Sequence, residues 1–140
     1  MRRALPGGFE LDDDRERIDR DEVHRFLSEE SYWARSRARE VVDRLLDVSS
    51  RLVGLYDADD RQRGFSRTVS DGVAVAYLAD VYVHPEIRGR GLGVELVRFT
   101  VDEGPFAAAR WFLNTDDAHE LYERFGFGVP DATVMTRPRG

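Results

Sequence analysis

The 140-residue sequence predicts a mixed α/β fold, in which a mostly antiparallel central sheet of six to seven strands carries helices on both faces. The spacing of apolar residues supports this, because it alternates between the helical period and the strand period along the chain. The resulting order is a strand, two helices, three hairpin-linked strands, a helix, a strand, a helix and a final strand pair. No repeat, low-complexity segment or linker divides the sequence, so residues 1–140 are expected to form one domain.

The first half of the chain contains a short strand, two helices and the first long strand. Phe9 to Leu11 predicts the short strand, and Asp19 with Glu22 predicts a capping box that begins the first helix. Apolar residues at helical spacing predict a second helix from about Ala34. The long strand is predicted for Ser50 to Tyr56.

The second half begins with a hairpin at Asp71-Gly72, a dipeptide typical of tight turns. The hairpin leads into a long apolar strand, which is followed by a glycine-rich loop and a helix that ends at about Glu103. The predicted elements are strands over Gly64 to Ser70, Val73 to Val83 and Trp111 to Leu113, a helix over Asp117 to Phe125, and a strand pair within Phe127 to Thr136.

The composition excludes several classes of function. A formal net charge of −6 argues against nonspecific nucleic-acid binding, because a phosphate backbone requires a basic surface. The absence of cysteine excludes disulfides, a thiol nucleophile and thiolate metal sites, and the three scattered histidines predict no metal site. No apolar run is long enough to span a bilayer, and the first residues lack the apolar stretch of a signal peptide. We therefore expect a cytoplasmic protein with no membrane or nucleic-acid partner.

The glycine-rich loop predicts a binding site for a phosphorylated ligand. Arg88-Gly89-Arg90-Gly91-Leu92-Gly93 lies between a strand and a helix, where unpaired backbone N–H groups and the helix dipole attract anions. Glycine allows close approach to the backbone, and arginine supplies donors suited to phosphate. A P-loop is excluded because the chain has no lysine, and the glycine spacing differs from the Rossmann pattern. A solvated turn remains the alternative.

Two motifs resemble those of the GNAT acetyltransferase superfamily. The spacing Arg88-x-x-Gly91-x-Gly93 is similar to the pyrophosphate loop of that family, and Asn114 to Phe127 resembles its Asn-x-x-Ala-x-x-Leu-Tyr-Glu-Lys-x-Gly-Phe segment. The order of predicted elements is also that of the GNAT fold. The matching residues of the second motif are Ala118, Leu121, Tyr122, Glu123, Gly126 and Phe127.

The resemblance implies a small bacterial N-acetyltransferase that uses acetyl-CoA as co-substrate. The acceptor would be a small-molecule amine or a peptide amino terminus, and the acetyl group would move by direct attack. Thr115 occupies the position where the family usually has asparagine, so its contact with the coenzyme is in question. The coenzyme-binding residues implied are Tyr82, Val83, Arg88, Gly89, Arg90, Gly91, Leu92, Gly93 and Thr115.

Asp80 and Tyr122 are the predicted catalytic residues. Asp80 interrupts an apolar strand, on the same predicted face as Leu78 and Tyr82, and would act as general base. The alternative is a carboxylate that binds the ammonium group or pairs with an arginine. Tyr122 is the usual general acid of the family, and its alternative is ordinary core packing. Because a phenol is a weaker acid than a thiol, Tyr122 is expected to donate a hydrogen bond to the departing sulfur.

The sequence leaves further alternatives open. Tyr32 and Trp33 either line the acceptor pocket or anchor a helix. Asp71 and Glu29 are weaker candidates for the base. An acyl-CoA-binding sensor that has the fold but no turnover is the competing function. A predicted edge strand near residue 130 makes a homodimer possible.

Overall fold

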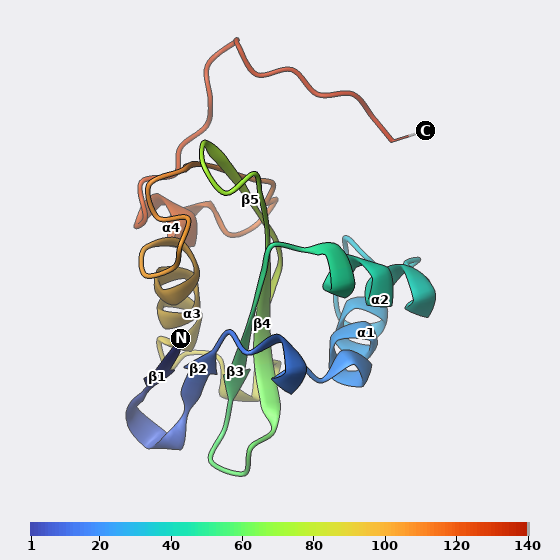
Figure 1. Cartoon of the computed structure of the whole chain (residues 1–140), viewed down its shortest axis with the longest axis vertical. Coiled ribbons are helices and arrows are strands. Elements are labelled where there is room, and N and C mark those ends of the chain that lie inside the picture. The colour runs from blue at the N-terminus through green and yellow to red at the C-terminus, as the bar shows by residue number, and fades with distance from the viewer. Residues whose placement is uncertain (140) are drawn as a thin grey trace.

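A six-stranded sheet forms the centre of the computed structural model, which describes residues 1–139 (Figure 1). The strands lie in the order β1-β2-β3-β4-β5-β6, and every neighbouring pair is antiparallel except the parallel pair β5 and β6. This confirms the predicted mostly antiparallel sheet. The strands are β1 (Arg2–Ala4), β2 (Glu10–Asp12), β3 (Arg51–Tyr56), β4 (Gln62–Ser70), β5 (Val75–Val83) and β6 (Arg110–Leu113).

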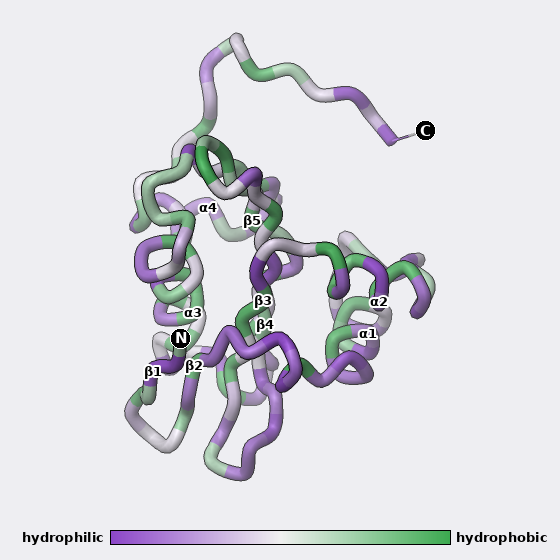
Figure 2. The backbone as a smooth tube through the Cα atoms, in the orientation of Figure 1, coloured by the Kyte–Doolittle hydropathy of each residue, from purple (hydrophilic) through white to green (hydrophobic). Residues whose placement is uncertain are grey.

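Helices cover both faces of the sheet, as predicted. Figure 1 shows α1 (Arg20–Glu29) and α2 (Arg39–Val48) on one side, and α3 (Leu92–Val101) and α4 (His119–Glu123) on the other. Hydropathy alternates along α1 and α2 (Figure 2), as expected of helices with one buried face. Short 3-10 turns lie at Pro6–Gly8, Arg15–Arg17 and Pro85–Ile87. No helix within residues 1–139 is long and apolar enough to cross a membrane.

The core is divided by the sheet. On the side of α1 and α2, the ring of Phe26 stacks on Tyr82 with a centroid distance of 3.7 Å. On the side of α3 and α4, Leu96 and Phe99 pack on the N-terminal strands, and Leu78 packs with Tyr122. α1 and α3 therefore pack on opposite faces of the sheet, over β4 and β5.

A β-bulge in β5 corrects the predicted face of Asp80. The register moves from Phe65 opposite Tyr82 to Arg67 opposite Ala79, so β5 has one residue more than β4 over this stretch. Asp80 has a positive φ of 53°, a conformation that Asp tolerates better than most residues. One extra residue reverses the alternation of side chains. Asp80 and Tyr82 consequently face α1 and α2, whereas Leu78 faces α3 and α4.

The first helices differ from prediction in two details. Asp19 caps α1 as predicted, because its carboxylate accepts a hydrogen bond from the Glu22 backbone N–H at 3.1 Å. The reciprocal half of the capping box is absent in the described residues, since Glu22 binds Arg25 and the Asp19 N–H donates to Gln62. The second helix begins at Arg39 rather than near Ala34, because residues 31–38 form a loop over the sheet.

Both ends of the chain also differ. β1 was missed because its short, charged sequence has no strand alternation, yet it pairs with β2 through ion pairs such as Arg2 with Glu10. The predicted strand pair within 127–136 does not form. Pro130 lacks a backbone N–H, and Asp131 accepts a hydrogen bond from the Thr133 N–H, which turns the chain. The remaining bounds agree with the predicted elements to within a few residues, although α4 is shorter than predicted.

Candidate active site

The glycine-rich loop is exposed to solvent at the beginning of α3. Gly91 is the N-cap residue of this helix, has a φ of 75°, and provides no side-chain cap. Within residues 1–139, the backbone N–H groups from Gly89 to Val94 make no hydrogen bond. Unpaired donors at a helix N-terminus attract an anion. A Cβ at Gly89 or Gly91 would have no atom within 4 Å, so the space above the loop is open.

This open space belongs to a cavity of about 640 Å³ between the starts of α3 and α4. Its walls include Val83 at the end of β5, the glycine loop, and the segment from Asp116 to Leu121. Of the predicted coenzyme-binding residues, Val83, Arg88, Gly89, Gly91, Leu92 and Gly93 line this cavity together. Arg90 is exposed on the same loop but does not line it.

The end of β5 presents a free edge toward this cavity. β6 pairs with β5 only from Val75 to Leu78, so the two strands separate beyond the bulge. The backbone N–H of His84 donates to the Arg63 carbonyl at 2.8 Å, which places His84 and Tyr82 on the β4 side of the strand. Val83 faces the opposite edge, where its carbonyl accepts a hydrogen bond from Arg88 Nε at 3.0 Å. The register thus favours Val83 over Tyr82 as the residue with available backbone groups.

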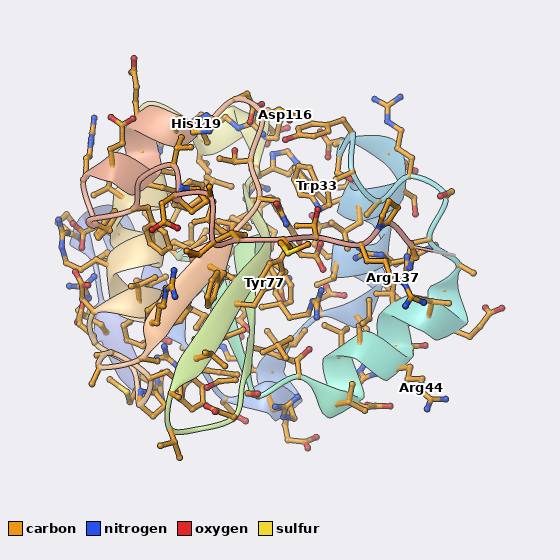
Figure 3. All side chains as sticks on the ribbon, turned by 90° about the horizontal axis from the view of Figure 1, so that it is seen from above. Trp33, Arg44, Tyr77, Asp116, His119 and Arg137 are labelled. Atoms are coloured by element: carbon orange, nitrogen blue, oxygen red, sulfur yellow. The ribbon has the colours of Figure 1, made fainter. Side chains whose placement is uncertain are left out.

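A second cavity of about 370 Å³ lies next to the first, on the side of α1 and α2. Its walls come from the loop before α2, from β5 and from the segment after β6. Figure 3 labels Trp33, Tyr77 and Asp116, which line the cavity from these three segments in turn. The two cavities share residues 116–118, so the glycine loop and the second cavity are adjacent compartments. Tyr32, Trp33, Asp80, Thr115 and Tyr122 all line the second compartment.

Asp80 is bound by donors on both carboxylate oxygens. Its Oδ2 accepts from Arg37 Nη1 and from Arg67 Nε, each at 2.9 Å, and its Oδ1 accepts from Trp33 Nε1 at 2.9 Å. The residue is only 7% exposed. The predicted alternatives for Asp80 were a general base and a carboxylate that binds the ammonium group or pairs with an arginine, and this geometry favours the arginine pairing. The weaker candidates have local partners, since Asp71 caps its own turn and Glu29 binds Arg25.

Tyr122 is buried in the wall of the second cavity. Its ring packs edge-to-face against Phe127, with the centroids 5.9 Å apart, and joins the core cluster of Leu78. The hydroxyl makes no hydrogen bond to any of residues 1–139. Burial raises the pKa of Tyr122 to about 12, and the negative charge of Asp117 acts in the same direction. The ring therefore packs in the core, as one alternative predicted, and the general-acid role stays a prediction for a hydroxyl that lacks an acceptor within residues 1–139.

Thr115 and Tyr82 use their side chains structurally. The Thr115 hydroxyl accepts a hydrogen bond from the Ala118 N–H at 3.1 Å before the first turn of α4. The Tyr82 ring lies in the core, and its hydroxyl accepts from Gln62 at 3.4 Å. Neither side chain faces the glycine-loop cavity, although Thr115 lines the neighbouring one.

Four charged residues of the site were missed in the sequence. Arg37 and Arg67 are 43 and 13 residues from Asp80 in the chain, so no local motif connects them. Asp116 and Asp117 are exposed where the two cavities meet. Carboxylates at a helix start are expected from helix-dipole effects alone, so this pair carries no specific signal of a site.

Comparison with known proteins identifies the family of the chain. A sequence model of the family described as "Acetyltransferase (GNAT) domain" matches residues 49–129, which include the glycine loop and Tyr122. The chain belongs to the GNAT acetyltransferase family. This family uses acetyl-CoA as co-substrate. No curated protein matches the sequence.

Solved structures extend the GNAT similarity over almost the whole chain. A protein from Xanthomonas campestris assigned to the GNAT family is 35% identical, with a TM-score of 0.87 over 94% of this chain and 93% of its own. An acetyltransferase candidate from Deinococcus radiodurans is 23% identical, with a TM-score of 0.72 over 98% and 94% of the two chains. Glucosamine-6-phosphate N-acetyltransferase from Arabidopsis thaliana is 14% identical, with a TM-score of 0.64 over 92% and 97%. The last two similarities concern the fold alone.

Proposed function

We propose that this GNAT protein is an acetyl-CoA-dependent N-acetyltransferase that acts on a small amine or a peptide amino terminus. The observation that carries the proposal is the junction of the two cavities. One cavity contains the unpaired N–H groups of the glycine loop, the other contains Tyr122, and residues 116–118 line both. A donor bound in the first cavity and an acceptor bound in the second would meet at this junction.

The glycine loop fits the pyrophosphate of the coenzyme. The N–H groups from Gly89 to Val94 would donate to phosphate oxygens, and Arg88 and Arg90 would supply positive charge. The positive φ at Gly89 and Gly91 and the empty space above them support this fit, because a ligand could approach the backbone there. Val83 would then pair with the extended arm of the coenzyme in the manner of an added strand.

The coenzyme, when bound, supplies an acetyl group activated as a thioester. Tyr122 would donate a hydrogen bond to the departing sulfur, since its hydroxyl has no acceptor within residues 1–139. With a pKa of about 12 the phenol is a weaker acid than a thiol near 8.5, so complete proton transfer to the thiolate is uphill by roughly 5 kcal/mol. A hydrogen bond from a protonated phenol is therefore the more favourable role.

The acceptor amine must lose a proton before it attacks the acetyl carbon. Asp80 was the predicted base, but both of its oxygens already accept hydrogen bonds. Asp116 and Asp117 are exposed at the junction, where they would attract the ammonium form and pass its proton to solvent. We assign Asp80 to the shaping of the acceptor cavity.

Release of free thiol from acetyl-CoA, measured with a panel of amines, tests the proposal. Amine-dependent thiol release and a mass increase of one acetyl group on the amine nitrogen are the expected results. A titration with coenzyme A tests the glycine loop separately. Coenzyme binding without release on any amine would instead support the acyl-CoA sensor.

A further inference from the structure

The acceptor cavity contains an unequal set of charges at its inner wall. Asp80 supplies one carboxylate, and Arg37 and Arg67 each supply a guanidinium within 2.9 Å of it. The side chains of Arg37 and Arg67 are 18% and 10% exposed. The inner wall therefore carries one excess positive charge in a largely buried position. Such a charge is costly to bury unless an anion approaches it.

Arg37 has the free donors that such an anion needs. Its Nη1 binds Asp80, whereas its Nε and Nη2 have no hydrogen-bond partner among the described residues. These two atoms form one edge of the guanidinium, which matches the paired oxygens of a carboxylate or phosphate. Arg67 has less capacity, because its Nε binds Asp80 and its Nη1 binds Ser49. Arg37 lines the cavity directly.

Two carboxylates line the same cavity where it meets the glycine-loop cavity. Asp116 and Asp117 are exposed at the junction with the glycine-loop cavity. The charged residues that line the acceptor cavity thus form two groups, with largely buried arginines around Asp80 and exposed carboxylates at the junction. An ammonium group is attracted to the junction, where the reacting amine must lie, and an oxyanion is attracted to Arg37.

We infer that the acceptor carries a carboxylate or phosphate in addition to its amine, and that Arg37 is the residue that recognises this oxyanion. The inference rests on the proposed function, because it describes the acceptor of the same reaction. A cavity of about 370 Å³ accommodates a small molecule of this kind.

Matched pairs of amines, with and without the oxyanion, test the inference. We choose O-phosphoethanolamine against ethanolamine, and L-phenylalanine against phenethylamine, so that phosphate and carboxylate are distinguished. Binding is measured by calorimetry in the presence of coenzyme A, and turnover by thiol release from acetyl-CoA. The oxyanion-bearing member of at least one pair is expected to bind at least about tenfold better than its partner, because charge-assisted hydrogen bonds to a guanidinium contribute that much.

Arg37→Gln is the decisive variant, and the preference ratio within each pair is the readout. The ratio is expected to fall about 10- to 100-fold in Arg37→Gln and to recover partly in Arg37→Lys, which keeps the charge but loses the fork. Arg44→Gln is the matched control, since Arg44 is exposed on α2 and has no hydrogen bond or ion pair within residues 1–139 (Figure 3). Its ratio should stay within about twofold of the wild type. If Arg37→Gln does not fold, the ratio in Arg37→Lys decides.

The outcomes separate this inference from the proposed function. Turnover of amines without preference for the oxyanion, or a ratio unchanged in Arg37→Gln, overturns the inference and leaves the acetyltransferase in place. Binding of oxyanion-bearing amines that depends on Arg37, without thiol release, supports the recognition site and overturns the acetyltransferase. Absence of both binding and release overturns both.

Discussion

Alanine substitutions at two glycines, Gly91 in the glycine loop and Gly72 outside it, distinguish a loss of coenzyme binding from a loss of stability caused by backbone strain. Gly91 has a φ of 75° and Gly72, in the β4–β5 turn, has a φ of 83°, and a Cβ at either position has no atom within 4 Å. Alanine at a positive φ costs about 1–2 kcal/mol, which is offset by about 0.4–1 kcal/mol through the unfolded state. Both Gly91→Ala and Gly72→Ala are thus expected to lose about 1 kcal/mol of unfolding free energy, or roughly 3–6 °C in Tm.

Only Gly91→Ala is expected to weaken the binding of the coenzyme. The added methyl group would occupy open space that a pyrophosphate needs, and the loss of one charge-assisted hydrogen bond weakens binding roughly 10- to 100-fold. Calorimetric titration with coenzyme A and thermal melting of both variants provide the comparison. Equal coenzyme Kd values in Gly91→Ala and Gly72→Ala, at equal loss of Tm, would refute the assignment of the loop.

Three further predictions concern the catalytic cavity and the buried phenols. Tyr122→Phe should lower kcat by about 10²–10³-fold in the thiol-release assay. The free energy of unfolding in urea should change by less than about 1 kcal/mol, because the hydroxyl has no partner within residues 1–139. Unchanged turnover would contradict the proposed hydrogen bond from Tyr122 to the leaving sulfur. Asp80→Ala leaves two buried guanidiniums without their counter-charge and should cost about 3–5 kcal/mol in urea unfolding, and a cost below 1 kcal/mol would contradict the pairing. Burial raises the pKa values of Tyr56, Tyr82 and Tyr122, the last to about 12. In the unfolded chain the phenol pKa is about 10, so these side chains ionise at lower pH in the unfolded state than in the folded state. Stability is then complete below about pH 10 and falls toward pH 12 by about 1.4 kcal/mol per pH unit for each phenol, and urea midpoints that stay constant from pH 9 to 11.5 would contradict it.

The parts of the site that depend on local sequence were predictable. The glycine loop needs only unpaired N–H groups at a helix start, and residues 88–93 indicate this directly. The cap at Asp19 is equally local. Tyr122 was identified only because the surrounding motif resembles the GNAT pattern, since its position in an apolar helix face is typical of core.

The surroundings of Asp80 were not predictable, because they depend on a bulge and on distant segments. A regular strand places Asp80 beside Leu78, and the single extra residue in β5 moves it to the other face. Arg67 and Arg37 then reach it from β4 and from the loop before α2. Part of that loop, from about Ala34, was itself predicted as helix, because Ala34 and Ala38 continue the helical spacing of the apolar residues of α2.

The β5 bulge has a consequence for how the chain tolerates change in length. The bulge inserts one extra residue into β5 opposite β4. Deletion of any one residue between Ala79 and Val81 would therefore restore one-to-one pairing and regular alternation of the side chains. Tyr82 would stay opposite Phe65 and against the ring of Phe26, whereas β6 could pair with β5 beyond Leu78 and close the gap between the two strands. A substitution within this stretch therefore changes one side chain and keeps the bulge. A deletion would instead remove the bulge and replace the two adjacent cavities with a flatter, more regular sheet.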